Sequence, residues 1–156
     1  SGNDTVLPDR RNDDLLTLTV TRGLSTTLFY AGLATELSRL GKTILAVHLA
    51  DYTTRCFRFV GELLAKAGYL GAVDCGIAVT NIKGISLAYR EQYFMASMGA
   101  VGYPKDAYRR TARSTVSLLQ DEPHEAARAL VMPLAIAMSQ GKVDLFSMFE
   151  KKEPQP

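Results

Sequence analysis

The segment from Val73 to Tyr89, VDCGIAVTNIKGISLAY, constrains the fold more than any other part of the chain. From Val73 to Val79 every second residue is apolar, and the residues between them are small or polar. The same alternation returns from Ile85 to Tyr89. A repeat of two residues is the pattern of a strand with one buried face. The segment therefore predicts two β-strands that are close in sequence.

The short link between these strands has the composition of a tight turn. Asn81 can open a turn through a side-chain hydrogen bond to the backbone, and Gly84 can take a positive φ. We therefore interpret the segment as a β-hairpin. Its second face carries Gly76 and Ala78, which leave room for a helix or another backbone to approach closely.

Four elements are predicted ahead of this hairpin. Leucine and valine alternate with threonine over residues 16–20, which indicates a strand. Apolar residues at spacings of four, four and three indicate an amphipathic helix over residues 25–40, ended by Gly41. An apolar run over residues 43–50 predicts a buried central strand. A second helix is expected over residues 53–67, where a glycine follows.

The chain after the hairpin is expected to form a loop or a short helix over residues 91–105, which mix methionine, aromatic residues, glycine and proline. Residues 108–119 contain several β-branched residues and are interpreted as a long strand, with a helix as the alternative. Asp121-Glu122-Pro123 is an acidic, proline-containing helix start. We expect this last helix to kink at Pro133 and to stop at Gly141.

The length of 156 residues and the apolar fraction of 47% are those of one globular domain. Residues 1–14 and 150–156 are polar and are expected to be flexible tails, so the domain spans residues 15–149. The predicted fold class is α+β, with a mixed or mostly antiparallel sheet of about five strands and two or three helices packed on it. Cys56 and Cys75 are interpreted as buried free thiols, which fits a reducing cytoplasm.

Several residues resemble parts of known motifs without completing one. Gly41-Lys42-Thr43 resembles the end of a phosphate-binding loop, but Glu36 stands where that motif has its first glycine. His48, Asp51 and Cys56 suggest a thiol paired with a base, but His48 is expected in a buried strand and Cys56 on a packed helical face. The cysteines and histidines lack the spacing of a metal site. We therefore expect no catalytic centre, metal or cofactor.

Positive charge gathers between Lys83 and Arg113, where six basic residues and two acidic ones give a net charge of six minus two, or +4. Such cations can contact phosphates, and tyrosine rings can stack on bases. The same charges are also ordinary on a solvated sheet face. The methionine and aromatic residues of 93–103 offer another surface for a partner or a dimer contact. The candidate binding residues are Lys83, Arg90, Tyr103, Lys105, Tyr108, Arg109, Arg110 and Arg113.

Two stretches, VDCGIAVTNIKGISLAY and YPKDAYRRTARSTVSLLQDEPHEAARALVMPL, resemble the C-terminal region of uncharacterised actinobacterial proteins described as Schlafen-like AlbA-domain or predicted ATP-binding proteins. There a strand with a VDxGIAVTxIKG-like core precedes a YRRT strand and an acidic, proline-containing helix start. The resemblance covers about residues 70–135. It implies an accessory domain of a bacterial regulatory or nucleic-acid-associated protein, and it carries over no catalytic residue.

The predicted function is that of a non-enzymatic binding or interaction domain of a bacterial cytoplasmic protein. Its expected partners are nucleic acid or another polyanion at the basic segment, or a second copy of the chain as a homodimer, and no membrane contact is expected. Two alternatives stay open. One is an enzyme or small-ligand sensor with a pocket that draws on His48, Tyr89, Tyr93 and Arg110, and the other is a domain that serves only to oligomerise.

Overall fold

The computed structural model describes residues 16–20, 26–30, 34–37, 41–88 and 102–139. These residues form seven strands and three helices, so the predicted α+β class is confirmed. In chain order the elements are β1 (Leu16–Val20), β2 (Thr26–Tyr30), β3 (Ala34–Leu37), β4 (Gly41–Leu45), α1 (Ala46–Lys66), β5 (Ala72–Thr80), β6 (Ser86–Ala88), β7 (Ala107–Thr115), α2 (Val116–Asp121) and α3 (Pro123–Ser139). The two expected tails and most of the expected 91–105 loop lie outside the described residues.

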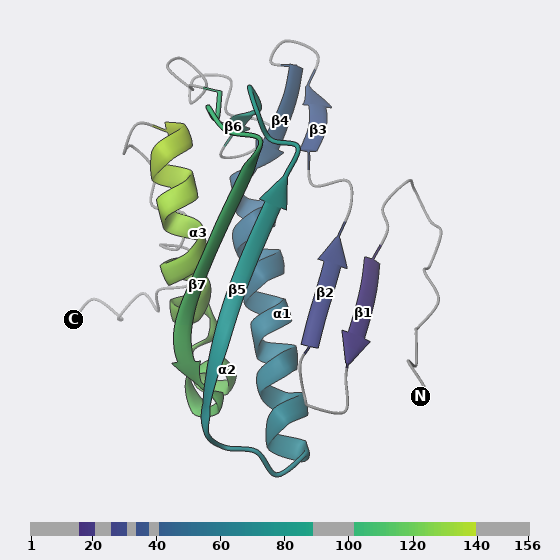
Figure 1. Ribbon diagram of the computed structural model, residues 1–156, viewed down its shortest axis with the longest axis vertical. Helices are drawn as coiled ribbons and strands as arrows, with labels where there is room; N and C mark the ends of the chain where they lie inside the picture. The colour runs from purple at the N-terminus through teal and green to yellow at the C-terminus, as the bar shows by residue number, and fades with distance from the viewer. Residues whose placement is uncertain (1–15, 21–25, 31–33, 38–40, 89–101, 140–156) are drawn as a thin grey trace, which may run out of the picture.

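The described strands pair in three small sheets and not in the single sheet of about five strands that we expected. β1 and β2 form an antiparallel pair, and β5 and β7 form another. β3, β4 and β6 form a three-stranded sheet in which β4 and β6 run parallel. The β5–β7 pair, with nine residues in each strand, runs along the helices for much of the height of the molecule (Figure 1).

The predicted alternation along β5 is confirmed. The residues that are buried or half-buried on its inner face are Val73, Cys75, Ile77 and Val79. The small residues of the other face are exposed, and a Cβ built on Gly76 would meet only Thr111 and the carbonyl of Arg110, both on the neighbouring strand. The expectation that a helix presses on this small face is therefore wrong for the described residues, since the helices pack on the apolar face.

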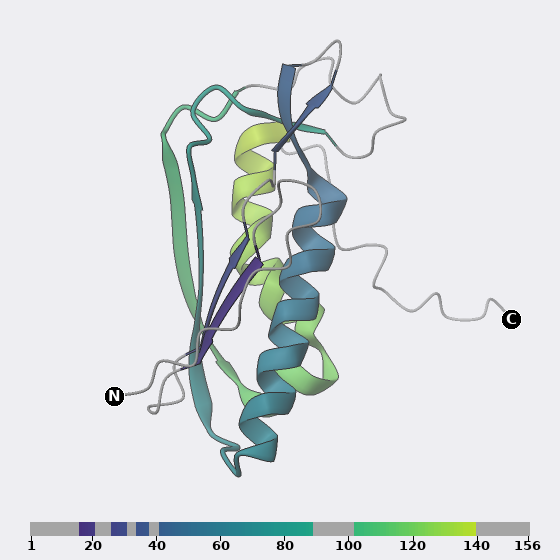
Figure 2. The same ribbon diagram turned by 90° about the vertical axis from the view of Figure 1, so that its right-hand side faces the viewer.

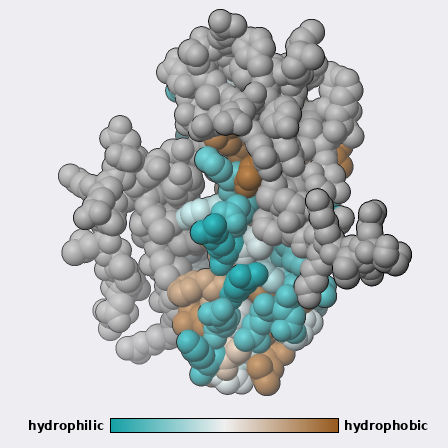
Figure 3. Space-filling view, turned by 180° about the vertical axis from the view of Figure 1, so that it is seen from behind, coloured by the Kyte–Doolittle hydropathy of each residue, from teal (hydrophilic) through white to brown (hydrophobic). Residues whose placement is uncertain are grey.

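Helices α1 and α3 lie on one side of the β5–β7 pair, as two views at right angles show (Figures 1 and 2). The core lies between these layers, and its largest fully buried side chains include Ile44, Val116, Leu119, Leu130, Leu134 and Met138. Seen from behind, much of the described surface is hydrophilic, with apolar groups toward its lower end (Figure 3). Along β5 one face is buried or half-buried toward the helices and the other is exposed.

Helix α1 begins at Ala46, seven residues before its predicted start at residue 53. The predicted strand over residues 43–50 is therefore wrong beyond Leu45, and His48 is exposed in the first turn of the helix. A short apolar run fits a buried helical turn as well as a buried strand, so its composition alone does not separate the two. The strand that does form, β4, is shorter than we expected.

The end of α1 agrees with the prediction that a glycine stops it. Gly68 has a φ of +79°, which glycine adopts without a steric penalty. Its amide donates to the carbonyl of Ala65 at 2.9 Å, and the amide of Tyr69 donates to the carbonyl of Leu64 at 3.0 Å. These two bonds form a Schellman motif, which satisfies carbonyls that the helix would leave without donors.

The amphipathic helix predicted for residues 25–40 is wrong. The described part of this segment forms β2 and β3, which pair with β1 and β4 respectively. Spacings of three and four residues fit a helix, but Thr26 and Thr27 are β-branched and favour a strand. Pairing of β2 with β1 and of β3 with β4 then satisfies backbone hydrogen-bonding groups of these strands.

The hairpin predicted for residues 73–89 has the right strands and the wrong pairing. β5 pairs with β7, and β6 pairs with β4. The turn between β5 and β6 contains the positive φ expected at Gly84, +75°, and another at Asn81, +59°, which asparagine tolerates. Alternation determines which side chains share a face, and it does not determine which strand lies alongside.

The C-terminal elements follow the sequence more closely. The strand predicted over residues 108–119 is β7, but it ends at Thr115, and the residues after it form α2. Thr115 caps this helix, because its Oγ1 accepts a hydrogen bond from the amide of Leu118 at 3.2 Å. Helix α3 begins at Pro123 and contains Pro133, but Asp121 and Glu122, which we expected at its start, are the last residue and the C-cap of α2. The predicted stop at Gly141 lies outside the described residues.

Candidate binding site

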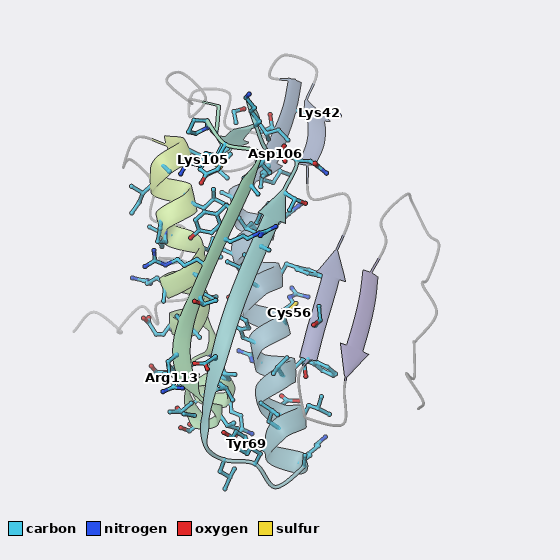
Figure 4. The ribbon with its side chains drawn as sticks, viewed as in Figure 1. Lys42, Cys56, Tyr69, Lys105, Asp106 and Arg113 are labelled. Carbon is cyan, nitrogen blue, oxygen red and sulfur yellow. The ribbon has the colours of Figure 1, made fainter. Side chains whose placement is uncertain are left out.

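Three of the candidate residues, Lys83, Lys105 and Arg109, lie toward one end of the β5–β7 pair, and all three are exposed. Lys83 lies in the turn after β5, Lys105 in the segment before β7, and Arg109 is the third residue of β7. We call these three residues the basic end. Figure 4 shows Lys105 at the upper end of the molecule, together with the exposed Asp106.

Backbone hydrogen bonds hold the two lysine-bearing segments side by side. The amide of Ile82 donates to the carbonyl of Asp106 at 3.1 Å, and the amide of Gly84 donates to the carbonyl of Tyr103 at 2.8 Å. A Cβ built on Gly102 would lie 2.7 Å from the carbonyl oxygen of Gly84, so only glycine allows this approach. The backbone, and not a side-chain contact, therefore sets the position of Lys83 beside Lys105.

Arg109 lies on the exposed face of β7, opposite Ala78 of β5 in the register. Its neighbours across and along the strands are short, because Ala78 and Thr111 flank it on this face. Among the described residues, no ion pair engages Lys83, Lys105 or Arg109. Nothing in the part of the chain that the structure describes therefore competes with an anionic partner for these three cations.

Arg113, in contrast, already has a carboxylate partner. Its Nε lies 3.1 Å from Oδ1 of Asp74, which stands opposite Arg113 in the β5–β7 register. The hydrogen bond to Asp74, followed by the attraction of the same carboxylate, raises the pKa of the Arg113 guanidinium. Both side chains are well exposed, so the pair is weak, yet it cancels the charge locally. Figure 4 shows Arg113 far from Lys105, toward the other end of β7.

Arg110 has a structural role next to the proline of α3. Its Nε donates to the carbonyl of Ala129 at 3.0 Å. In a regular helix that carbonyl would accept from the amide four residues later, but residue 133 is proline and has no amide hydrogen. Arg110 therefore supplies the donor that Pro133 lacks.

The two tyrosines of the candidate site pack inward. Tyr108 is 9% exposed, and its hydroxyl donates to the carbonyl of Leu130 at 2.5 Å. Burial raises the pKa of Tyr108. Tyr103 is half-buried and packs edge-to-face on Tyr108, with ring centroids 6.4 Å apart and planes at 83°. Tyr108 is thus part of the core and Tyr103 packs against it, and stacking of either ring on a base stays a prediction. The remaining candidate, Arg90, lies outside the described residues.

Lys42 is a cation that the charge count along the sequence missed. It is exposed on β4, and Figure 4 shows it at the same end of the molecule as Lys105 and Asp106. Gly41-Lys42-Thr43 lies inside a strand, and Thr43 is fully buried with its Oγ1 3.4 Å from Oγ of Ser86. A phosphate-binding loop would instead connect a strand to a helix. Gly41-Lys42-Thr43 is therefore not the end of such a loop.

The residues weighed for catalysis do not assemble. His48 is exposed, and burial raises the pKa of Cys56 to about 11 and raises that of Cys75 as well. Both cysteines are free thiols, as predicted. Within the described ranges no group of three or more acidic, histidine or cysteine side chains could hold a metal ion. Tyr89 and Tyr93, which the pocket alternative needs, lie outside the described residues.

Comparisons with protein-family models, with curated proteins and with solved structures found no match to this chain. In the part of the chain that the structure describes, no helix combines the length and the apolar composition of a membrane span.

Proposed function

We propose that this chain contributes a non-enzymatic binding domain to a bacterial cytoplasmic protein, and that its basic end contacts nucleic acid or another polyanion. One observation carries the proposal: Lys83, Lys105 and Arg109 are exposed near one end of the β5–β7 pair, without an ion-pair partner among the described residues. We do not include Arg113 and Arg110 in the proposed site, because Arg113 pairs with Asp74 and Arg110 donates to the carbonyl of Ala129.

The charge on these three residues is suited to phosphates. A lysine or arginine that neutralises one phosphate releases a condensed counterion, and this release drives binding that weakens with salt. The logarithm of the binding constant falls by about 0.9 per phosphate for each tenfold rise in salt, so three contacts predict a slope of about −2.7. A shallow slope of this size distinguishes a small cationic site from a long basic stripe.

The test is a titration of fluorescently labelled duplex DNA, duplex RNA and polyphosphate with the protein at low salt, followed by anisotropy. Arg109→Gln is expected to weaken binding and to reduce the salt slope by about 0.9. Arg113→Gln is the matched control, because it removes the same charge from the same face of the same strand but far from the basic end, and it should change binding little. Absence of binding by the unmodified protein to all three probes would overturn the proposal.

Self-association is a second candidate, favoured by an apolar corner at the other end of the molecule. Leu70 is 72% exposed and Tyr69 is 40% exposed. The corner is rigid, because Tyr69 closes the Schellman motif and its hydroxyl donates to the carbonyl of Ala72 at 2.5 Å. The molecular mass in solution over a range of concentrations tests this. A monomer at high concentration, unchanged by Leu70→Ser, excludes a homodimer through this corner.

A further inference from the structure

We infer that Lys42 belongs to the same binding surface, and that the ligand is a chain of phosphates, such as a nucleic-acid backbone, lying across the ends of three neighbouring segments. The inference rests on the proposed function of the basic end. It adds a fourth cation from a distant part of the sequence. It also restricts the class of ligand from any polyanion to a linear chain of phosphates that the protein contacts through the phosphates alone.

The first step is the order of the segments. The 102–106 segment is bonded to the 82–85 segment through Ile82 and Gly84. The 82–85 segment continues directly into β6, and β6 pairs with β4 in a register that sets Ser86 beside Thr43. Lys42 immediately precedes Thr43, so it lies beside the end of the segment that carries Lys83. The sequence of cations across the molecule is therefore Lys105, Lys83 and Lys42.

The second step is the spacing. The 102–106 and 82–85 segments are held together by backbone hydrogen bonds, and the 82–85 segment leads into β6, which pairs with β4 at the usual strand spacing of about 4.8 Å. The phosphates of a nucleic-acid strand repeat at regular intervals along a line, so cations on neighbouring segments can each meet a different phosphate. We call Lys42, Lys83, Lys105 and Arg109 the basic row. Because its cations are exposed on separate segments, the row suits a run of phosphates better than a single compact anion.

The third step concerns what the row can distinguish. The rings of Tyr103 and Tyr108 are packed against each other and the core, and Tyr108 is also bonded to the carbonyl of Leu130. Arg109 rises from a flat face beside Ala78 and Thr111. Cations on such a face reach phosphates, and phosphate contacts carry no sequence information. We therefore expect binding that is independent of sequence.

The experiment compares Lys42→Gln with Lys66→Gln, measured by anisotropy against two duplex DNAs of unrelated sequence over a range of salt. Lys66 is the control because it is exposed in the last turn of α1, at the far end of that helix from β4. Each phosphate contact contributes about −0.9 to the slope of the logarithm of the binding constant against the logarithm of the salt concentration. Lys42→Gln is therefore expected to make this slope shallower, from about −3.6 to about −2.7, and to weaken binding about eightfold at 0.1 M salt. Lys66→Gln should match the unmodified protein. Circular dichroism confirms that both variants fold.

Each outcome separates the two proposals. If the unmodified protein binds and Arg109→Gln weakens it, but Lys42→Gln behaves like Lys66→Gln, the basic end stands and the row is refuted. If one duplex binds more than about tenfold more tightly than the other, or a single strand outcompetes the duplex, contact through phosphates alone is refuted. A parallel titration with polyphosphate shows whether the protein prefers polyphosphate or duplex DNA. Tighter binding of either one supports a chain of phosphates as the ligand.

Discussion

Arg110 and Pro133 are expected to be energetically coupled. Pro133 removes the donor that the carbonyl of Ala129 would have in a regular helix, and Arg110 replaces it at 3.0 Å. A hydrogen bond from a charged donor contributes about 1.5–3 kcal/mol where it is shielded. Ala129 and Arg110 are both exposed, so water can reach the carbonyl once the arginine is removed. We therefore expect Arg110→Ala to cost about 1 kcal/mol, which is less than a shielded charged donor would contribute and is typical of an ordinary hydrogen bond.

The same substitution should cost almost nothing when residue 133 can donate. In Pro133→Ala the amide of residue 133 bonds the carbonyl of Ala129, and Arg110 is no longer needed as a donor. A double-mutant cycle should therefore give a coupling of about 1 kcal/mol between Arg110 and Pro133, which is within the range for residues that share a partner.

Urea unfolding followed by circular dichroism measures each free energy of unfolding, provided that the slope with urea is unchanged. Arg109→Ala is the matched control, because this adjacent arginine is exposed on the opposite face of β7 from Arg110, and it should change stability by less than about 0.5 kcal/mol. Equal effects of Arg110→Ala in both backgrounds, or no effect in either, would refute the reasoning.

Two further predictions concern Gly61, which is buried, and Cys56, which is half-buried, on α1. Gly61→Ala should lower the free energy of unfolding in urea by about 1–3 kcal/mol, because a Cβ there would lie 2.8 Å from Cβ of Leu119. The better helix propensity of alanine offsets only about 1 kcal/mol of this strain. A stabilised variant would contradict the close contact. The Cys56 thiol, whose pKa burial raises from 9.0 to about 11, should react with iodoacetamide about 100-fold more slowly at pH 8 than a thiol of pKa 9, because the thiolate is the reactive form. Since the folded chain holds this proton more tightly than the unfolded chain, its contribution to stability is present below pH 9 and is lost as the pH rises through about 11. Cys56→Ser should remove that alkaline loss, and identical pH profiles for the two proteins would count against it.

The local patterns were informative where one face of an element is buried and its length is marked by clear signals. Alternation along β5, the glycine stop of α1 at Gly68 and the start of α3 at Pro123 all agree with the structure. The pattern failed over residues 25–40, where a few apolar residues at helical spacing were outweighed by strand pairing with the segments on either side. It failed again at His48, because an apolar run beside a strand can begin a helix.

The site was harder to predict because its members depend on pairing between distant segments. The sequence identifies Lys83, Lys105 and Arg109 as part of a basic stretch. It does not show that Asp74 neutralises Arg113, because these residues are 39 positions apart and meet only through the β5–β7 register. Lys42 joins the others only through the parallel pairing of β4 with β6. A count of charge along the chain detects neither effect.

The basic row has a consequence for the stability of the unliganded protein. Like charges about 10 Å apart repel by about 0.4 kcal/mol in water, and Asp106 offsets only part of this repulsion among the four cations. Salt at 0.15 M screens charges beyond about 8 Å, so adding salt should strengthen the fold at this end while it weakens attachment to phosphates. The domain therefore responds to ionic strength in two opposite directions, with the free form favoured by high salt and the bound form by low salt.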